Sequence, residues 1–147
     1  MPRFLRDKRS PKSKSVFVSR VMSANRSKNT SPEFQVRHEL RRIGLEGFRL
    51  HTSLPGRPDI AFLKKKLAIF INGCFWHQCP KCENPMPKHN REFWRKKFLN
   101  NQIRDKKKIR ELRAMGWSSV VIWECDIKKD ANKVIEKLRD KLKVRPR

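Results

Sequence analysis

The sequence has no apolar stretch that approaches the roughly 18 residues of a membrane-spanning helix. Its basic N-terminus is not followed by the apolar run of about 7–15 residues that a secretory signal requires. It also contains no internal repeat. We therefore expect a cytoplasmic protein without a membrane partner, in which the four cysteines are reduced or metal-bound rather than paired in disulfides.

Acidic residues are scarce. The 147 residues include 14 Asp and Glu but 38 Lys and Arg, which gives a net charge of +24. Such a surface favours a polyanionic partner, and nucleic acid is preferred to an anionic membrane. The charge alone is also compatible with a soluble basic protein of the ribosomal type. The length suits one domain, predicted over residues 22–142 between a disordered basic arm (1–21) and a basic tail (143–147).

Hydrophobic periodicity predicts alternating helices and strands in this domain. A first helix should start near Thr30, because Thr30 and Glu33 have the spacing of a capping box, and Gly44 supplies its stop. Strands are predicted over residues 47–54, 59–63, 67–73 and 117–125, and further helices over residues 92–116 and 131–142. The order α-β-β-β-α-β-α predicts an α/β sandwich with a central mixed sheet.

Three of these segments carry more detailed expectations. The strands over residues 59–63 and 67–73 should form a hairpin through the lysine run 64–66. The strands over residues 67–73 and 117–125 are apolar enough to be buried. The apolar positions of the long helix are Phe98, Ile103, Ile109, Leu112 and Met115.

Three of the four cysteines lie in the stretch GCFWHQCPKC, residues 73–82. Cys79 and Cys82 have the spacing of a zinc knuckle, and Cys74 with Cys125 would complete four thiolates around a tetrahedral Zn²⁺. A closed four-sulfur site is structural, since it leaves no position for substrate. The alternatives are free cysteines, a redox pair, or His77 in place of one cysteine ligand.

Two aromatic side chains lie between these cysteines. A zinc ion would clamp both ends of residues 75–78, and Phe75 and Trp76 would then point outward as a rigid apolar wedge. Proteins that bend or probe duplex DNA insert such wedges between base steps. The alternative is that both rings belong to the core.

Asp59 ends the turn sequence PGRPD at the start of a predicted strand, as in metal-dependent nucleases. The usual second half of that pattern, an acidic residue and a lysine on the next strand, is absent, because this strand carries Phe70-Ile71-Asn72. His77 and Glu33 remain as nearby candidates. A Mg²⁺-bound aspartate with a histidine is a workable set for phosphodiester hydrolysis. An ordinary turn aspartate is the alternative.

Several longer segments carry a family resemblance: MSANRSKNTSPE (22–33), LPGRPDIAF (54–62), IFINGCFWHQC (69–79), EFWRKKFLNNQIRDKK (92–107) and GWSSVVIWEC (116–125). Together they resemble the very-short-patch repair (Vsr) endonucleases over roughly residues 22–128. The resemblance implies a restriction-endonuclease-like fold. It also implies Mg²⁺-dependent nicking of double-stranded DNA on the 5′ side of the thymine in a T·G mismatch, the product of 5-methylcytosine deamination.

The resemblance also implies roles for individual residues. Asp59 and the backbone carbonyl of Ile71 would bind Mg²⁺, Glu33 would orient water on that ion, and His77 would act at the scissile phosphate. Phe75, Trp76 and Trp94 would form the intercalating wedge, and Lys97 and Asn101 would approach the mismatch. A nucleoid-associated monomer is expected, with mismatch-repair proteins as partners.

The chain departs from the family pattern in three places. Asn72 occupies the catalytic position at which the best-known members carry a second histidine, and Cys79 stands where they have a histidine zinc ligand. The first 21 residues exceed the usual start. Two alternatives therefore stay open: a restriction-type or other DNA nuclease of the same fold, and a zinc-stabilised DNA-binding module without catalysis.

Overall fold

The computed structural model describes residues 30–83 and 85–144, so the predicted arm over residues 1–21 lies outside the described part. The elements are α2 (Ser31–Arg42), β1 (Arg49–Leu50), β2 (Ile60–Phe62), β3 (Leu67–Asn72), α3 (Cys74–His77), α4 (Arg91–Ala114), β4 (Ser118–Trp123) and α5 (Glu124–Val144). Within these residues, no helix has the length and apolar character needed to cross a lipid bilayer.

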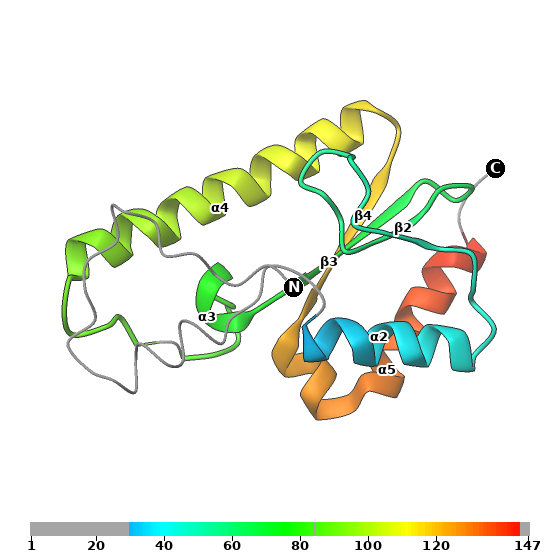
Figure 1. Ribbon diagram of the computed structural model, residues 1–147, viewed down its shortest axis with the longest axis horizontal. Helices are drawn as coiled ribbons and strands as arrows, with labels where there is room; N and C mark the ends of the chain where they lie inside the picture. The colour runs from blue at the N-terminus through cyan, green and yellow to red at the C-terminus, as the bar shows by residue number, and fades with distance from the viewer. Residues whose placement is uncertain (1–29, 84, 145–147) are drawn as a thin grey trace.

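The four strands form one sheet in the order β1-β2-β3-β4. β2 pairs antiparallel with β1 and β3, whereas β3 and β4 are parallel. The predicted hairpin and the predicted mixed sheet are therefore confirmed. In Figure 1, α2 and α5 lie together on one side of the sheet, while α4 runs along the other side and extends beyond the sheet to α3.

Alternating side chains of β3 face two separate cores. Leu67 and Ile69 pack with the apolar faces of α2 and α5, including Leu40 and Leu138. Ala68 and Phe70 point the other way and pack with Leu112 near the end of α4. Because both faces of β3 are covered, five of its six residues are buried, as predicted.

The start of α2 follows the local sequence closely. Thr30 is the N-cap, and its hydroxyl accepts a hydrogen bond from the backbone N–H of Glu33 at 3.4 Å. The capping arrangement leaves the Glu33 side chain only 3% exposed, beside the sheet. The helix ends before Gly44, also as predicted.

Two strand predictions need correction. The first strand was expected over residues 47–54 but covers only Arg49–Leu50, because His51 adopts φ +48 and turns the chain out of the sheet. The last strand was expected to be buried, yet only Ile122 of β4 is fully buried. β4 pairs only with β3 among the described strands, so it forms one edge of the sheet.

Two helix predictions also need correction. Cys125 does not end a strand but lies in the first turn of α5, whose two parts join at a kink at Asp130. The second part corresponds to the helix predicted over residues 131–142. Ile103 on α4 and Met115, its C-cap, are about half exposed, at 54% and 51%, although both were counted among the apolar positions of the predicted helix.

The exposure of Ile103 and Met115 is explained by the composition of the inner face of α4. Its residues recur three or four positions apart: Trp94, Phe98, Asn101, Asp105, Lys108 and Leu112. The apolar residues at the two ends are buried, whereas the polar middle lines a hollow next to α3. The buried stripe is therefore interrupted by the site described below.

Candidate active site

Asp59 lies directly before β2, where the buried Pro58 ends the LPGRP turn. Its Oδ2 accepts a hydrogen bond of 2.7 Å from the backbone N–H of Ile71 on the neighbouring β3. Burial and repulsion from Glu33 outweigh this hydrogen bond and raise the pKa of Asp59 from 3.8 to about 6. The carboxylate is thus held in a position where its charge is poorly compensated by the protein.

Replacing Asp59 by Asn should stabilise the protein when no divalent cation is added. The folded-state pKa lies above the unfolded value, so stability is lost as pH rises from about 4 to about 6 and stays lower above it. Allowing for partial exposure, Asp59→Asn should gain about 2 kcal/mol at pH 8 and little at pH 4. Urea unfolding at both pH values measures this. Parallel stability curves for the two proteins would contradict it, and Asp140→Asn on exposed α5 is the matched control.

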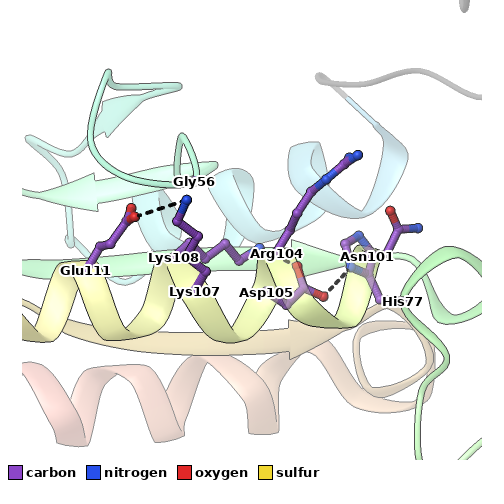
Figure 2. A pocket seen from close by; sticks show the side chains of 8 residues that line it. All are labelled: Gly56, His77, Asn101, Arg104, Asp105, Lys107, Lys108 and Glu111. Carbon is purple, nitrogen blue, oxygen red and sulfur yellow. Dashed lines mark hydrogen bonds and ion pairs between the residues drawn. The ribbon is translucent and has the colours of Figure 1, made fainter. Parts of the chain in front are cut away.

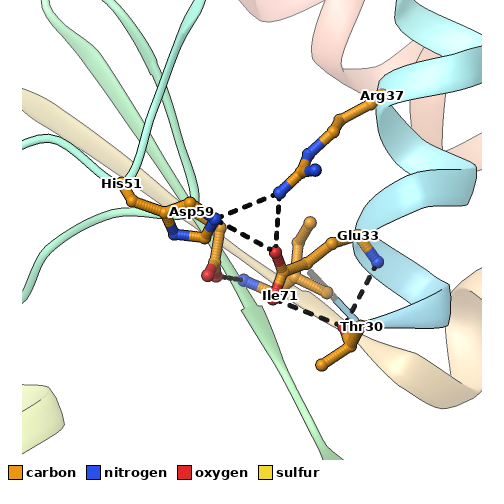
Figure 3. Close-up of polar contacts among 6 residues, drawn as sticks. All are labelled: Thr30, Glu33, Arg37, His51, Asp59 and Ile71. Carbon is orange, nitrogen blue, oxygen red and sulfur yellow. Dashed lines mark hydrogen bonds and ion pairs between the residues drawn. The ribbon is translucent and has the colours of Figure 1, made fainter. Parts of the chain in front are cut away.

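Glu33 and His51 lie beside Asp59 (Figure 3). Each of the three side chains offers a ligand atom within 4.8 Å of the others. The Glu33 carboxylate accepts a hydrogen bond of 2.9 Å from Arg37, in an ion pair whose partners are 3% and 5% exposed. The structure therefore brings together two predicted site residues, Glu33 and Asp59, and adds His51, which the sequence analysis missed.

His77, at the end of α3, is paired with a residue that the sequence analysis also missed. Its Nδ1 lies 2.7 Å from Asp105 Oδ2 on α4 (Figure 2). Burial would raise the pKa of Asp105, but the His77 hydrogen bond and the Lys108 ammonium, 2.9 Å from Oδ1, outweigh it and lower that pKa. Asp105 is thus ionised, and it fixes the orientation of the imidazole.

Lys108 connects the two parts of the site. Its side chain is 13% exposed, its ammonium lies 4.0 Å from the centre of the Phe70 ring, and its charge acts to lower the pKa of Asp59. The stem of Lys108 passes close to Gly56, where an added Cβ would lie 2.5 Å from Lys108 Cδ. Gly56 also has φ +76, so the LPGRP turn requires glycine for its backbone and for this close approach.

The hollow beside α4 measures about 380 Å³, and its lining is mostly polar or charged, with more basic than acidic residues: Gly56, His77, Asn101, Arg104, Asp105, Lys107, Lys108 and Glu111. Asn101, expected to approach DNA, lines it and donates a 3.0 Å hydrogen bond to the Trp76 carbonyl. Lys97 lies one turn earlier on α4 and is half-buried.

Asn72 is buried at the end of β3, at 4% exposure, opposite Trp123 in β4.

The predicted wedge residues form one aromatic cluster between α3 and α4. Phe75 packs edge-on against Trp76, Trp94 and Phe98, with ring centres 5.1, 5.7 and 5.3 Å apart. Phe75 and Trp76 are half-buried, whereas Trp94 is 7% exposed and lies in the interior of the cluster. The segment between the first two cysteines is thus a helical turn that is docked by its aromatic side on α4.

The four cysteines gather at the start of α3 and α5, and their sulfurs all lie within 4.8 Å of one another. Cys79 Sγ is 3.7 Å from Cys125 Sγ, and two sulfurs on one tetrahedral zinc would be about 3.8 Å apart for Zn–S bonds of about 2.3 Å. Burial opposes the ionisation of Cys79, but backbone N–H groups of Lys81 and Cys82 outweigh it and lower the pKa of that thiol. Four sulfurs in this arrangement fit Zn²⁺. His77, the alternative ligand, is bonded to Asp105 instead.

Comparisons with known proteins identify the family of this chain. Residues 8–84 match the family model described as DNA mismatch endonuclease Vsr. The chain is 43% identical over 108 residues to the type II nicking enzyme V.XorIIP of Xanthomonas oryzae pv. oryzae, covering 73% of this chain and 79% of that one. The chain belongs to the Vsr family.

Two further relatives support the assignment. The DNA mismatch endonuclease Vsr of Escherichia coli is 34% identical over 125 residues, covering 84% of this chain and 80% of that one. The solved catalytic domain of the homing endonuclease I-Bth0305I is 27% identical with a TM-score of 0.51, covering 78% of this chain and 94% of that one. The α/β fold with a mixed sheet is therefore confirmed, and it is similar to that of a homing endonuclease domain.

As a member of the Vsr family, the chain is a DNA endonuclease, a phosphodiester hydrolase whose substrate is DNA. The assignment favours catalysis over the non-catalytic DNA-binding module. Asp105 and His51 were missed because their partners are distant in sequence: His77 and Asp105 are 28 positions apart. A charged residue on the inner stripe of α4 was the available signal for Asp105.

Proposed function

We propose that this Vsr-family enzyme nicks one strand of duplex DNA on the 5′ side of the thymine in a T·G mismatch, in a Mg²⁺-dependent reaction. The observation that carries the catalytic part of the proposal is the pairing of His77 with Asp105, which Lys108 links to the half-buried Asp59 beside Glu33. The match to DNA mismatch endonucleases supports a mismatched substrate. Mismatch-repair proteins as partners and a monomeric state remain predictions.

The donor set around Asp59 fits Mg²⁺, which prefers carboxylate oxygens. The raised pKa of Asp59 also favours a bound cation, because a cation would compensate the negative charge that the protein itself compensates poorly. Asp59 and the Ile71 carbonyl would hold the ion, with Glu33 beside it. When bound, Mg²⁺ would neutralise charge on the scissile phosphate and lower the pKa of a bound water.

His77 is the group that would move a proton. Because ionised Asp105 accepts a hydrogen bond from Nδ1–H, the neutral imidazole presents the Nε2 lone pair on the opposite side of the ring. An imidazole oriented in this way by a carboxylate is suited to general acid–base work near neutral pH. Arg104, Lys107 and Lys108 around the same hollow supply the charge that binds DNA phosphates.

Zinc would act as a structural element. Bound to the sulfurs of Cys74, Cys79, Cys82 and Cys125, it would tie both ends of α3 to the start of α5. The aromatic packing of Phe75 on α4 and the zinc site would together fix the position of His77. The wedge would then consist of Phe75 and Trp76, with the interior Trp94 supporting them from behind.

Trp76→Ala should reduce mismatch discrimination more than general DNA binding. Inserting an aromatic ring unstacks a base step at a cost of roughly a few kcal/mol, and that cost is lower at a distorted T·G pair than at a matched pair. Removing the ring should therefore reduce the T·G over C·G preference about tenfold or more. Affinity for matched duplex, which depends on the net charge of +24, should change little. An intact preference would mean that the ring only packs on α4.

The experiment that tests the proposed function compares nicking of T·G and C·G duplexes of identical flanking sequence, with and without Mg²⁺. We expect Mg²⁺-dependent cleavage of the T·G duplex and little of the C·G duplex. Equal cleavage of the two would favour the restriction-type nuclease, and binding without any cleavage would contradict the catalytic role of the site. Asp140→Asn serves as a surface control for the variants.

A further inference from the structure

The proposed function leaves His51 without a role, although it borders the carboxylates of the site (Figure 3). Its Nε2 is 3.6 Å from Glu33 Oε2, and it belongs with Glu33 and Asp59 to a set of donor atoms within 4.8 Å of one another. The ring is 22% exposed, so it is neither a core residue nor a free surface histidine. Its position allows it to contact anything that Glu33 and Asp59 hold between them.

The contact with Arg37 shows which nitrogen of His51 faces the site. Arg37 Nη2 lies 3.1 Å from His51 Nε2. A guanidinium can only donate hydrogen bonds, so Nε2 must accept, and the proton of the neutral ring is on Nδ1. The lone pair of Nε2 is therefore directed at Arg37, next to the Glu33 carboxylate that Arg37 also contacts, and this form of imidazole is the one that binds metals.

The backbone of His51 directs the ring there. His51 has φ +48, a left-handed conformation that is uncommon for residues other than glycine. It ends β1 after two residues and carries the side chain back toward α2 and Asp59. Such backbone strain is concentrated at functional sites, where surrounding contacts maintain it.

We propose that His51 Nε2 is a nitrogen ligand of the divalent cation that Asp59 holds beside Glu33, and that it raises the affinity of the site for Mn²⁺ relative to Mg²⁺. The inference rests on the proposed function for the presence of that cation. Mg²⁺ strongly prefers oxygen ligands, whereas first-row transition metals accept imidazole nitrogen. One nitrogen in an otherwise carboxylate site therefore changes which metal binds best.

The donor atoms are spaced almost as closely as one ion requires. Two ligands on one octahedral ion with bonds of about 2.1 Å are about 3 Å apart when adjacent and about 4.2 Å apart when opposite. The donor atoms of His51, Glu33 and Asp59 lie within 4.8 Å of one another, and His51 Nε2 is 3.6 Å from Glu33 Oε2, so a small shift of the imidazole would bring Nε2 into the shell of an ion on Asp59. In this structure Arg37 donates a hydrogen bond to the Nε2 lone pair of His51. A bound metal ion would replace Arg37 as the cationic partner of His51, and Arg37 would retain its hydrogen bond to Glu33.

The test measures metal binding by the full chain with its cysteine site already loaded with zinc. Electron spin-echo modulation of bound Mn²⁺ should show coupling to a ¹⁴N nucleus, and labelling the histidines with ¹⁵N should change it. His51→Gln keeps an acceptor for Arg37 but lacks the ring nitrogen, so it should lose this coupling. Its Mn²⁺ affinity should fall about tenfold while its Mg²⁺ affinity stays within about twofold. His38→Gln, on the exposed face of α2, is the matched control.

The outcomes separate this inference from the proposed function. If the wild-type protein nicks with Mg²⁺ and binds Mn²⁺ through Asp59, but shows no nitrogen coupling, only the role of His51 is overturned. The same holds if His51→Gln keeps the wild-type ratio of Mn²⁺ to Mg²⁺ affinity. If the wild-type protein binds neither ion, both proposals fail. Equal zinc content and thermal transitions for the variants verify that they are folded.

Discussion

Asp59→Ala is expected to reduce Mg²⁺-dependent nicking by about three orders of magnitude or more. A cation at a scissile phosphate contributes several kcal/mol to the transition state, and each 1.36 kcal/mol is a factor of about ten in rate. Asp59 is the acidic side chain fixed by a hydrogen bond to β3, and loss of its carboxylate would leave Glu33 as the only acidic side chain in the Glu33–His51–Asp59 cluster. Single-turnover nicking of a T·G duplex measures the effect.

Binding of DNA should survive the same substitution. The basic side chains around the hollow belong to α4 and are kept in the variant, and removal of a negative charge near phosphate does not weaken their contacts. Fluorescence anisotropy should therefore give a dissociation constant equal to or lower than that of the wild type. Asp140→Asn should leave both rate and affinity unchanged, because this residue is exposed on α5. Near-normal nicking by Asp59→Ala would remove Asp59 from the site.

Cys125→Ser is expected to remove bound zinc and to destabilise the fold. Cys125 is the only one of the four ligands outside residues 74–82, so its loss would detach α3 from the start of α5. Metal binding and folding are coupled at such sites. A loss of about 3 kcal/mol would lower Tm by roughly 6–12 °C for a chain of this size. Metal analysis and calorimetry measure both effects.

The metal content of the wild-type protein provides the control for this prediction. A closed four-sulfur site holds about one zinc per chain. Chelation of zinc from the wild type should reproduce the stability of Cys125→Ser, and the variant should then respond little to the chelator. Freshly purified, unchelated protein that contains no zinc and unfolds like the variant would contradict the zinc site.

Local sequence signals predicted the parts of the fold that depend on local interactions. The Thr30 and Glu33 spacing located the start of α2, and the lysine run 64–66 located the β2–β3 hairpin, because caps and short turns form within a few residues. β1 was overestimated because its end depends on the left-handed conformation of His51, which the hydrophobic pattern of residues 47–54 does not indicate.

The site itself could be predicted only in part. Asp59 and the cysteines stand in recognisable local patterns, Glu33 and His77 were nearby candidates, and the family resemblance supplied the roles expected of these two. Asp105 went unnoticed because its contact with His77 depends on how α3 docks on α4. The same docking explains the error on Ile103, since the inner face of α4 becomes polar where it lines the hollow.

The most direct test of the central claim is a T·G duplex that carries a different label on each strand, incubated with Mg²⁺ and separated on a denaturing gel. The proposed function predicts one product, from the thymine strand, that ends at the phosphodiester on the 5′ side of the mismatched thymine, with the guanine strand intact. Cleavage of both strands, or cleavage at the same position in a matched C·G duplex, would contradict it.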